Sequence, residues 1–109
     1  MREEITFEQS SGNVFKDIGF SDVEAERELL KADLAFELFR ILEERKLTQV
    51  KAGEILGIDQ SDVSRLKNGD FDRFSVERLF TFLNRLNRHV EIRITPAEDT
   101  VGHQRVVAV

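Results

Sequence analysis

Apolar residues recur at three- and four-residue steps through the first half of the chain. Between residues 30 and 42 they follow one face of an α-helix, and charged residues occupy the other side. The run SDVE at 21–24 is a capping box, in which a Ser side chain and a Glu side chain bind each other's backbone N–H groups. We therefore expect a helix that begins near Asp22, with a break near Asp33, and ends at the run ERK.

Three shorter helices are predicted by the residues at their ends. Thr48 is placed to cap a helix that Gly57 ends, because glycine readily adopts the left-handed conformation. Asp59 caps the next helix, which runs through Lys67 and stops at an Asn-Gly pair. Ser75 opens a fourth. The residues of this fourth helix predicted to face the core are Leu79, Phe82, Leu83 and Leu86.

The period changes to two in the segment HVEIRIT, residues 89–95. Val90, Ile92 and Ile94 alternate with polar residues, which is typical of a half-buried β-strand, and Pro96 ends the pattern. One strand alone leaves its backbone groups unpaired, and the chain offers only ITF near its start and RVVAV at its end as partners. A second copy is the more economical partner, so we expect a homodimer through these residues or through neighbouring Phe side chains.

Composition and charge narrow the function classes. The chain has no Cys, no long apolar run for a signal peptide or membrane span, and no paired His or phosphate-binding Gly loop. We therefore expect a cytoplasmic protein that is not an enzyme and needs no cofactor or metal. The formal net charge is −5, and all of that excess lies in residues 1–46; from residue 47 onward acids and bases balance. Lone His89 and His103 give no catalytic or ligand pattern.

Residues 47–69 carry the clearest functional pattern. Two short helices joined by a Gly-containing turn form a helix-turn-helix, whose second helix enters the DNA major groove. Gly53, in the middle of the first helix, costs about 1 kcal/mol relative to Ala, which indicates a close helix approach. Gln60 suits an adenine edge and Arg65 a guanine edge, while the first helix's N-terminus suits a phosphate. The candidate DNA-binding residues are Thr48, Gln49, Lys51, Gln60, Ser61, Ser64, Arg65, Lys67 and Asn68.

The runs LTQ, AGEILGI and QSDVSRLKNG together resemble the DNA-binding domain of Cro/phage-repressor-type regulators, the XRE family, over about residues 33–88. The resemblance implies a lambda-repressor-like helical fold and places Gln49 on a backbone-clamping glutamine. It places Gln60, Ser61 and Arg65 on base-contacting positions. Two departures are Lys51, where an acid is common, and Asp62, which brings a negative charge near the groove.

The flanks SSGNVFKDIGFSDVEAERELLKADL and LNRHVEIRITP resemble the HigA-type antitoxins and their small XRE relatives. This resemblance implies a dimer that represses its own operon and neutralises a RelE-like toxin, a basic mRNA-cleaving enzyme. The acidic first part, with Phe15, Ile18 and Phe20 as apolar anchors, would then bind the toxin. The basic and polar residues of the helix-turn-helix would bind double-stranded DNA at a near-palindromic operator.

Together these patterns predict an all-α bundle of four to five helices with one short C-terminal β-strand. We divide the 109-residue chain into a flexible acidic arm with the start of a helix at 1–32, a helix-turn-helix domain with the strand at 33–96, and a tail at 97–109.

Two other functions fit the same residues. The chain could be a stand-alone XRE-type regulator without a toxin, or a protein-interaction adaptor that does not bind DNA, in which Gln60 and Arg65 are ordinary solvated side chains. On charge alone, the acidic run 22–28 is interpreted as a solvated helix face and not as a toxin-binding surface. Four aromatic residues are expected to pack in the core or dimer contact rather than stack on bases: Phe71, Phe74, Phe80 and Phe82.

Overall fold

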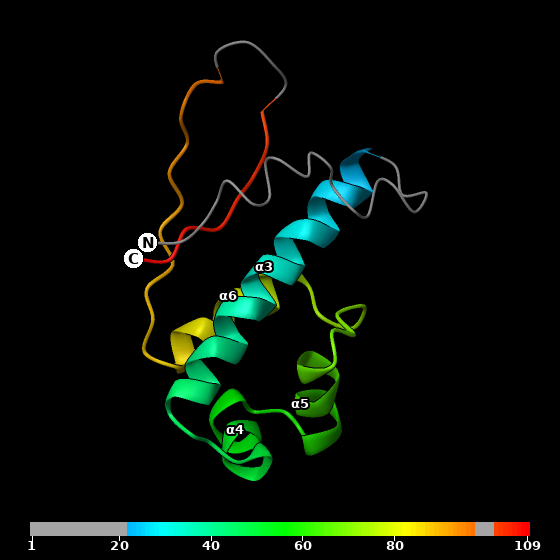
Figure 1. The fold of residues 1–109 in the computed structure, drawn as a ribbon, viewed down its shortest axis with the longest axis vertical. Helices are drawn as coiled ribbons and strands as arrows, with labels where there is room; N and C mark the ends of the chain where they lie inside the picture. Colours follow the sequence, from blue (N-terminus) through cyan, green and yellow to red (C-terminus); the bar gives the residue numbers. More distant parts are fainter. Residues whose placement is uncertain (1–21, 98–101) are drawn as a thin grey trace.

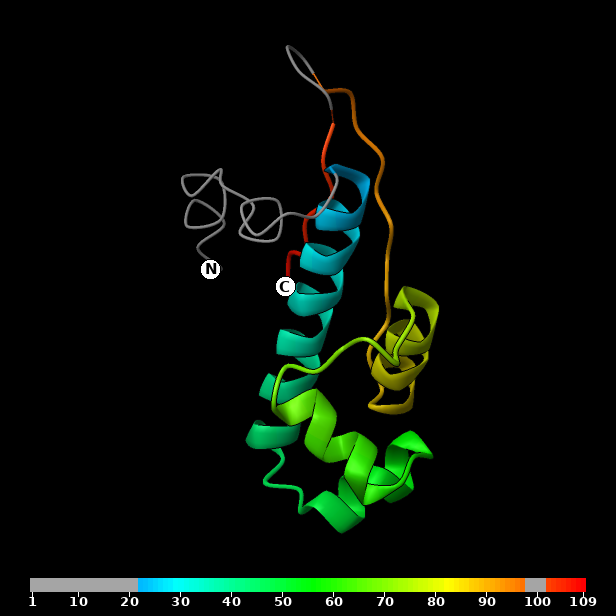
Figure 2. The same cartoon turned by 90° about the vertical axis from the view of Figure 1, so that its right-hand side faces the viewer.

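The computed structural model describes residues 22–97 and 102–109, and four α-helices are found there (Figure 1). Helix α3 spans Asp22–Glu44, α4 spans Gln49–Leu56, α5 spans Gln60–Lys67 and α6 spans Val76–Arg85. The long α3 packs along α6, and α4 and α5 lie together near the C-terminal end of α3 (Figures 1 and 2). The prediction of an all-α fold is confirmed for this part of the chain.

Helix α3 begins at Asp22, as the capping pattern predicts, although the expected cap Ser21 lies outside the described residues. It continues without interruption past Asp33, so the break expected there is wrong. The helix also crosses the boundary we placed between residues 32 and 33. The first turn is acidic, and Arg40 bridges Glu37 and Glu44 further along, with Nη2 of Arg40 2.8 Å from Oε1 of Glu37 and Nη1 2.7 Å from Oε2 of Glu44.

The hydrophobic core lies between α3, α6 and the two short helices. Helix α3 contributes Leu38, which is 1% exposed, and α6 contributes Leu79, which is fully buried. Phe74 precedes α6 and packs edge-to-face on Phe82, with ring centroids 5.9 Å apart, so these two aromatic rings belong to the core as expected. The other members of the buried cluster are Leu34, Ile41, Leu42, Ala52, Leu56, Val63, Leu66, Leu83 and Leu86.

No strand is present in residues 22–97 or 102–109, so the β-strand predicted at 89–95 is wrong for the single chain. A strand needs a neighbouring backbone, and none of the described segments supplies one. The run ITF lies outside the described residues. The run RVVAV belongs to a C-terminal segment that contacts α3 instead: Nδ1 of His103 lies 3.3 Å from Oε2 of Glu26, and Val106 packs against the core.

Within the described ranges, no helix is both long and apolar enough to cross a lipid bilayer.

Candidate nucleic-acid interface

Helix α4 is capped by Thr48, as predicted. The Thr48 backbone is extended, and its Oγ1 accepts a hydrogen bond from the Lys51 backbone N–H at 3.1 Å. The hydroxyl hydrogen of Thr48 is not used in this bond, so it can still be donated to another acceptor. Thr48 and Gln49 are both exposed. The start of α4 therefore presents a hydroxyl donor beside the free N–H groups of a helix N-terminus, which is a favourable place for an anion.

The turn between α4 and α5 holds the two helices against each other through Gly53. The Gly53 carbonyl accepts from the backbone N–H groups of Gly57 and Ile58, at 2.8 and 3.0 Å. A Cβ on Gly53 would lie 2.7 Å from the Ile58 carbonyl oxygen and 3.7 Å from Cγ2 of Val63. Since the first of these distances is too short for a real Cβ, a close approach at Gly53 is confirmed, and it is made by the turn that leads into α5. Gly57 adopts φ = 75°, as expected of a helix-ending glycine.

Helix α5 is capped by Asp59, as predicted. Oδ1 of Asp59 accepts from the Ser61 hydroxyl at 2.7 Å and from the Asp62 backbone N–H at 2.9 Å. These bonds, the one from Ser61 first, lower the pKa of the Asp59 carboxyl because they stabilise its charged form. The cap is therefore ionised at neutral pH. It also fixes the Ser61 side chain at the N-terminal end of the helix.

The two sides of α5 divide cleanly into buried and accessible residues. Val63 and Leu66 point into the core and are 3% and 7% exposed. The polar residues at the N-terminus and middle of the helix lie on the other side. They are Gln60 and Ser61, which are exposed, and Ser64 and Arg65, which are partly buried. The structure thus brings the predicted base-contacting residues together on one face.

Arg65 is held by a charge cluster that the sequence pattern revealed only in part. Its Nη1 lies 2.9 Å from Oδ1 of Asp62, and Nη1 of Arg73 lies 3.6 Å from the same oxygen. The Asp62 side chain is only 14% exposed, whereas that of Arg65 is 34% exposed. Asp62 therefore orients one predicted base-reading side chain and brings a second guanidinium beside it.

Arg73 is a candidate functional residue that no sequence pattern identifies. The three-residue spacing of Asp62 and Arg65 on one helix is visible in the sequence. Arg73 lies in the loop between α5 and α6, and no helical spacing relates it to Asp62. Only the path of that loop places its charge near α5.

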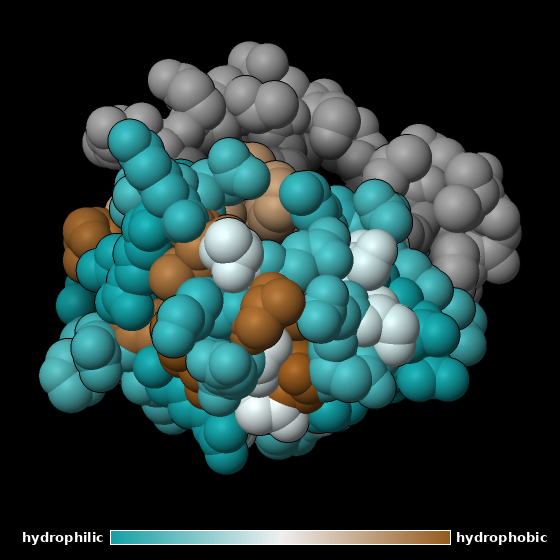
Figure 3. Space-filling model, turned by 90° about the horizontal axis from the view of Figure 1, so that it is seen from below, coloured by the Kyte–Doolittle hydropathy of each residue, from teal (hydrophilic) through white to brown (hydrophobic). Residues whose placement is uncertain are grey.

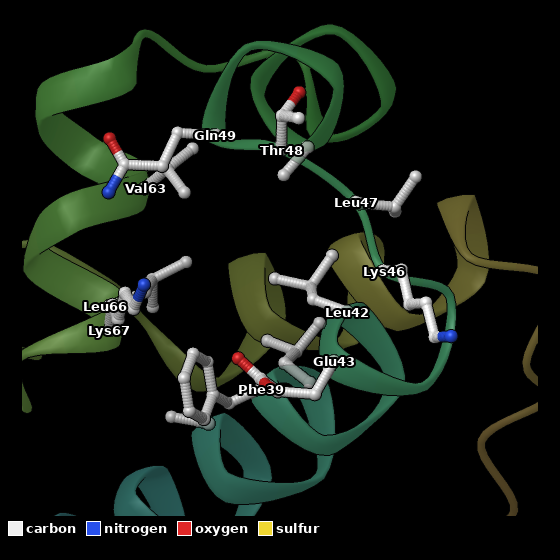
Figure 4. A pocket seen from close by; sticks show the side chains of 13 residues that line it. Phe39, Leu42, Glu43, Lys46, Leu47, Thr48, Gln49, Val63, Leu66 and Lys67 are labelled. Carbon is white, nitrogen blue, oxygen red and sulfur yellow. The ribbon is translucent and has the colours of Figure 1, made fainter.

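Gln49 is the first residue of α4, and its side chain extends toward α5 (Figure 4). It lines a cavity of about 160 Å³ that is bounded by α3, α4 and α5, and its amide points toward α5, as Figure 4 shows. The apolar walls include Leu42, Val63 and Leu66, and Lys67 lies at the α5 side. The amide is thus placed to connect a ligand at the start of α4 with the body of α5.

The remaining predicted DNA-binding residues are accessible. Lys51 is exposed and its Nζ lies 3.5 Å from Oε1 of Glu54, so this charge is only loosely paired. Lys67 and Asn68 are exposed at the end of α5, where Nδ2 of Asn68 lies 3.4 Å from the Ser64 hydroxyl. The end of the molecule where α4 lies is mainly hydrophilic, with a few separated hydrophobic side chains (Figure 3).

The other two predicted groups lie elsewhere. Phe15, Ile18 and Phe20, the expected partner-binding anchors, lie outside the described residues. Of the expected dimer residues, Val90 is partly buried against the core, and Ile92 and Ile94 are 71% and 91% exposed. Among residues 22–97 and 102–109, no group of three or more His, Cys, Asp or Glu side chains could hold a metal ion.

Comparison with known proteins agrees with this geometry. A family model described as a helix-turn-helix domain matches residues 14–95. A solved structure assigned by name to the XRE family of transcriptional regulators matches with a TM-score of 0.74 and 40% sequence identity, over 79% of this chain and 99% of the other. The curated proteins give no significant match.

Proposed function

This chain belongs to the helix-turn-helix domain family and to the XRE-type transcriptional regulators, and on that basis we propose that it is a sequence-specific repressor that binds double-stranded DNA as a homodimer. The observation that carries the proposal is the face of α5 on which Gln60, Ser61, Ser64 and Arg65 gather. A helix with hydrogen-bonding side chains at its N-terminal end and middle is the form that enters a major groove.

The residues on this face have distinct roles in the proposal. Gln60 reads an adenine edge and Arg65 donates two hydrogen bonds to a guanine, the pairings that geometry favours in the major groove. Asp62 keeps the Arg65 guanidinium from folding onto other acceptors before DNA arrives. Ser61 and Ser64 bind either base edges or phosphate.

The residues around α5 position the protein on the DNA backbone. The Thr48 hydroxyl and the N-terminus of α4 bind one phosphate, and Gln49 links that contact to α5. Charges at Lys51 and Lys67, with the Asn68 amide, add phosphate contacts that carry no sequence information.

Dimerisation explains how so small a domain selects an operator. Two copies related by a two-fold axis place their α5 helices about 34 Å apart, on successive major grooves of one side of the duplex. The operator is then a near-palindrome, and binding there blocks transcription.

We also propose that the acidic first part binds a basic protein, as an antitoxin binds a RelE-like toxin. Support comes from the acidic first turn of α3 and from the exposed Val23 and Phe36 on the same helix, which are 70% and 60% exposed. An acidic surface with apolar contacts suits a basic partner that itself binds RNA. In this proposal the acids serve the protein partner and the α5 face serves the DNA.

The DNA proposal is tested by fluorescence anisotropy at near-physiological salt. The protein is titrated onto the DNA upstream of its own gene and onto a scrambled duplex of the same composition. Tight binding to the upstream DNA alone is the expected result. Equal, weak binding to both would overturn sequence-specific recognition and favour the adaptor function.

The protein-partner proposal is tested by co-purification with the product of the adjacent gene. Replacing Phe15 and Ile18 by Asp should abolish that complex and leave DNA affinity unchanged, while Arg65→Ala should do the reverse. If no complex forms with the unchanged protein, the chain is a stand-alone regulator.

A further inference from the structure

Residues 89–95 form an extended segment whose apolar side chains are largely uncovered. The segment leaves the end of α6 and runs away from α4 and α5 in both views (Figures 1 and 2). Val90 packs partly against the core, whereas Ile92 and Ile94 are 71% and 91% exposed. An alternating segment of this kind offers both backbone hydrogen-bonding groups and an apolar face to another strand.

We propose that residues 89–95 pair antiparallel with the same residues of a second copy, with the two-fold axis at Ile92. This inference rests on the proposed homodimer and specifies its contact and register. It also accounts for the two-residue pattern that forms no strand within residues 22–97 of a single chain.

The charges on the polar face select this register. Centring the pair on Ile92 places Glu91 opposite Arg93 of the partner subunit, twice over by symmetry. Centring it on Glu91 or on Arg93 instead places that charge opposite its own copy, which is unfavourable across strands. A parallel arrangement about a two-fold axis also pairs each of these charges with itself.

The apolar face is fully paired in the same register. With the axis at Ile92, the two copies of Ile92 face each other and Val90 faces the partner's Ile94. A register shifted by one residue in the pairing places apolar side chains opposite polar ones and is therefore excluded by the alternation.

In the single chain, the charges of Glu91 and Arg93 are already accessible and lie on the same side of the segment. Nη2 of Arg93 lies 3.2 Å from Oε2 of Glu91, and the two side chains are 79% and 77% exposed. On dimerisation each charge exchanges this contact within one strand for one across strands. The α5 faces stay free, because the segment runs away from α4 and α5.

The absence of cysteine from the chain allows a direct measurement of register. Single cysteines are placed at residues 90 to 94 of the full-length protein, without DNA, and oxidised. Only Ile92→Cys should form a disulfide dimer rapidly, since its two copies lie directly opposite. The copies of a cysteine at 91 or at 93 lie about 8 Å apart, beyond disulfide reach.

Mixed samples provide the matched control. Glu91→Cys and Arg93→Cys should each cross-link poorly alone and readily when mixed. Fastest cross-linking of Glu91→Cys or of Arg93→Cys alone, or equal rates at all positions, would overturn the register. A monomer by sedimentation at concentrations that saturate DNA would overturn the contact itself, and DNA selectivity is scored separately.

Charge reversal gives a second, independent measurement. Glu91→Arg and Arg93→Glu should each weaken dimerisation roughly 2- to 30-fold by placing two like-charged pairs across the strands. The double reversal should restore the wild-type dissociation constant. If it is as weak as the single variants, these residues do not face each other.

Discussion

Residues 48–69 and residues 89–95 both adjoin the core, but they satisfy their backbone groups in different ways. In the first region each helix closes its hydrogen bonds within a few residues, and side-chain caps at Thr48 and Asp59 complete the helix ends. The second region has extended backbone and no strand partner among residues 22–97 and 102–109. One region is therefore complete in a single chain, whereas the backbone of the other has no strand partner there, and in the proposed dimer a second copy would supply one.

The largest expected effect is a loss of operator affinity in the helix-turn-helix region, with little change in its stability. Arg65→Ala should cost about 1 to 3 kcal/mol in operator binding and relax preference at one base position, because a guanidinium makes its contact with one base. The free energy of unfolding should fall by at most about 1 kcal/mol, since the Arg65 side chain is 34% exposed and the variant loses its ion pair with Asp62. Anisotropy on an operator and its single-base variants measures the affinity and the base preference. Urea unfolding measures the stability.

Lys51→Ala is the matched control for this experiment. Because Lys51 is assigned to phosphate, its loss should weaken all sequences alike and reduce the salt dependence. Unchanged operator affinity and selectivity in Arg65→Ala would contradict the placement of α5 in the groove.

The next variant tests the close packing at Gly53 in the same region. Gly53→Ala places a Cβ 2.7 Å from the Ile58 carbonyl oxygen. The backbone must move to relieve this clash. Overpacking of this kind lowers the free energy of unfolding by about 1 to 3 kcal/mol. The higher helix propensity of Ala offsets about 1 kcal/mol of this loss. Urea unfolding should therefore show a net loss of stability. Glu54→Ala, an exposed neighbour on the same helix, should lose none; equal behaviour of the two variants would show that the close approach is not required.

A smaller effect is expected from the charge that holds Arg65. Asp62→Asn removes an acceptor shared with Arg73 and one negative charge beside the groove. Scrambled DNA should bind more tightly, and operator preference should fall by roughly two- to fivefold, as for the loss of a partly exposed ion pair. Asp70→Asn removes the same charge from a nearby exposed loop residue. If both variants behave alike, Asp62 contributes charge alone and does not position Arg65.

The smallest effect concerns pH. The pKa of Asp59 is lowered in the folded protein below its ordinary value of 3.8, so its cap stabilises the fold fully above that value and loses this contribution as pH falls through the folded pKa. Asp59→Asn keeps the cap without the titration. The stability of the wild-type protein relative to this variant should hold steady from neutral pH to about pH 4 and then decline. A constant difference throughout the acid range would show that the carboxylate is not stabilised by its bonds.

Features that depend on neighbouring residues could be predicted from the sequence. The caps at Thr48, Asp59 and Ser75 act on backbone N–H groups three residues away, so a short pattern identifies them. Gly53 was identifiable because an interior glycine is unfavourable in a helix unless space requires it. The polar face of α5 follows from the spacing of Val63 and Leu66.

Features that depend on distant parts of the chain could not be predicted. Arg73 reaches Asp62 through a loop, and His103 contacts Glu26 across most of the sequence. The alternation at 89–95 predicts a strand that the single chain does not form, because a pattern of side chains does not show whether a partner backbone exists in the same chain. In the proposed dimer, the self-complementary arrangement of Glu91 and Arg93 is a local feature that favours a second copy as the partner.

The most direct test of the whole account is a methylation-protection and hydroxyl-radical footprint on the duplex that the protein selects from a random pool. The proposed dimer should give two patches of guanine N7 protection in the major groove, related by a dyad and centred about 10 base pairs apart. One patch without a dyad would contradict the dimer, and protection of the sugar backbone without any guanine N7 protection would contradict base reading by α5.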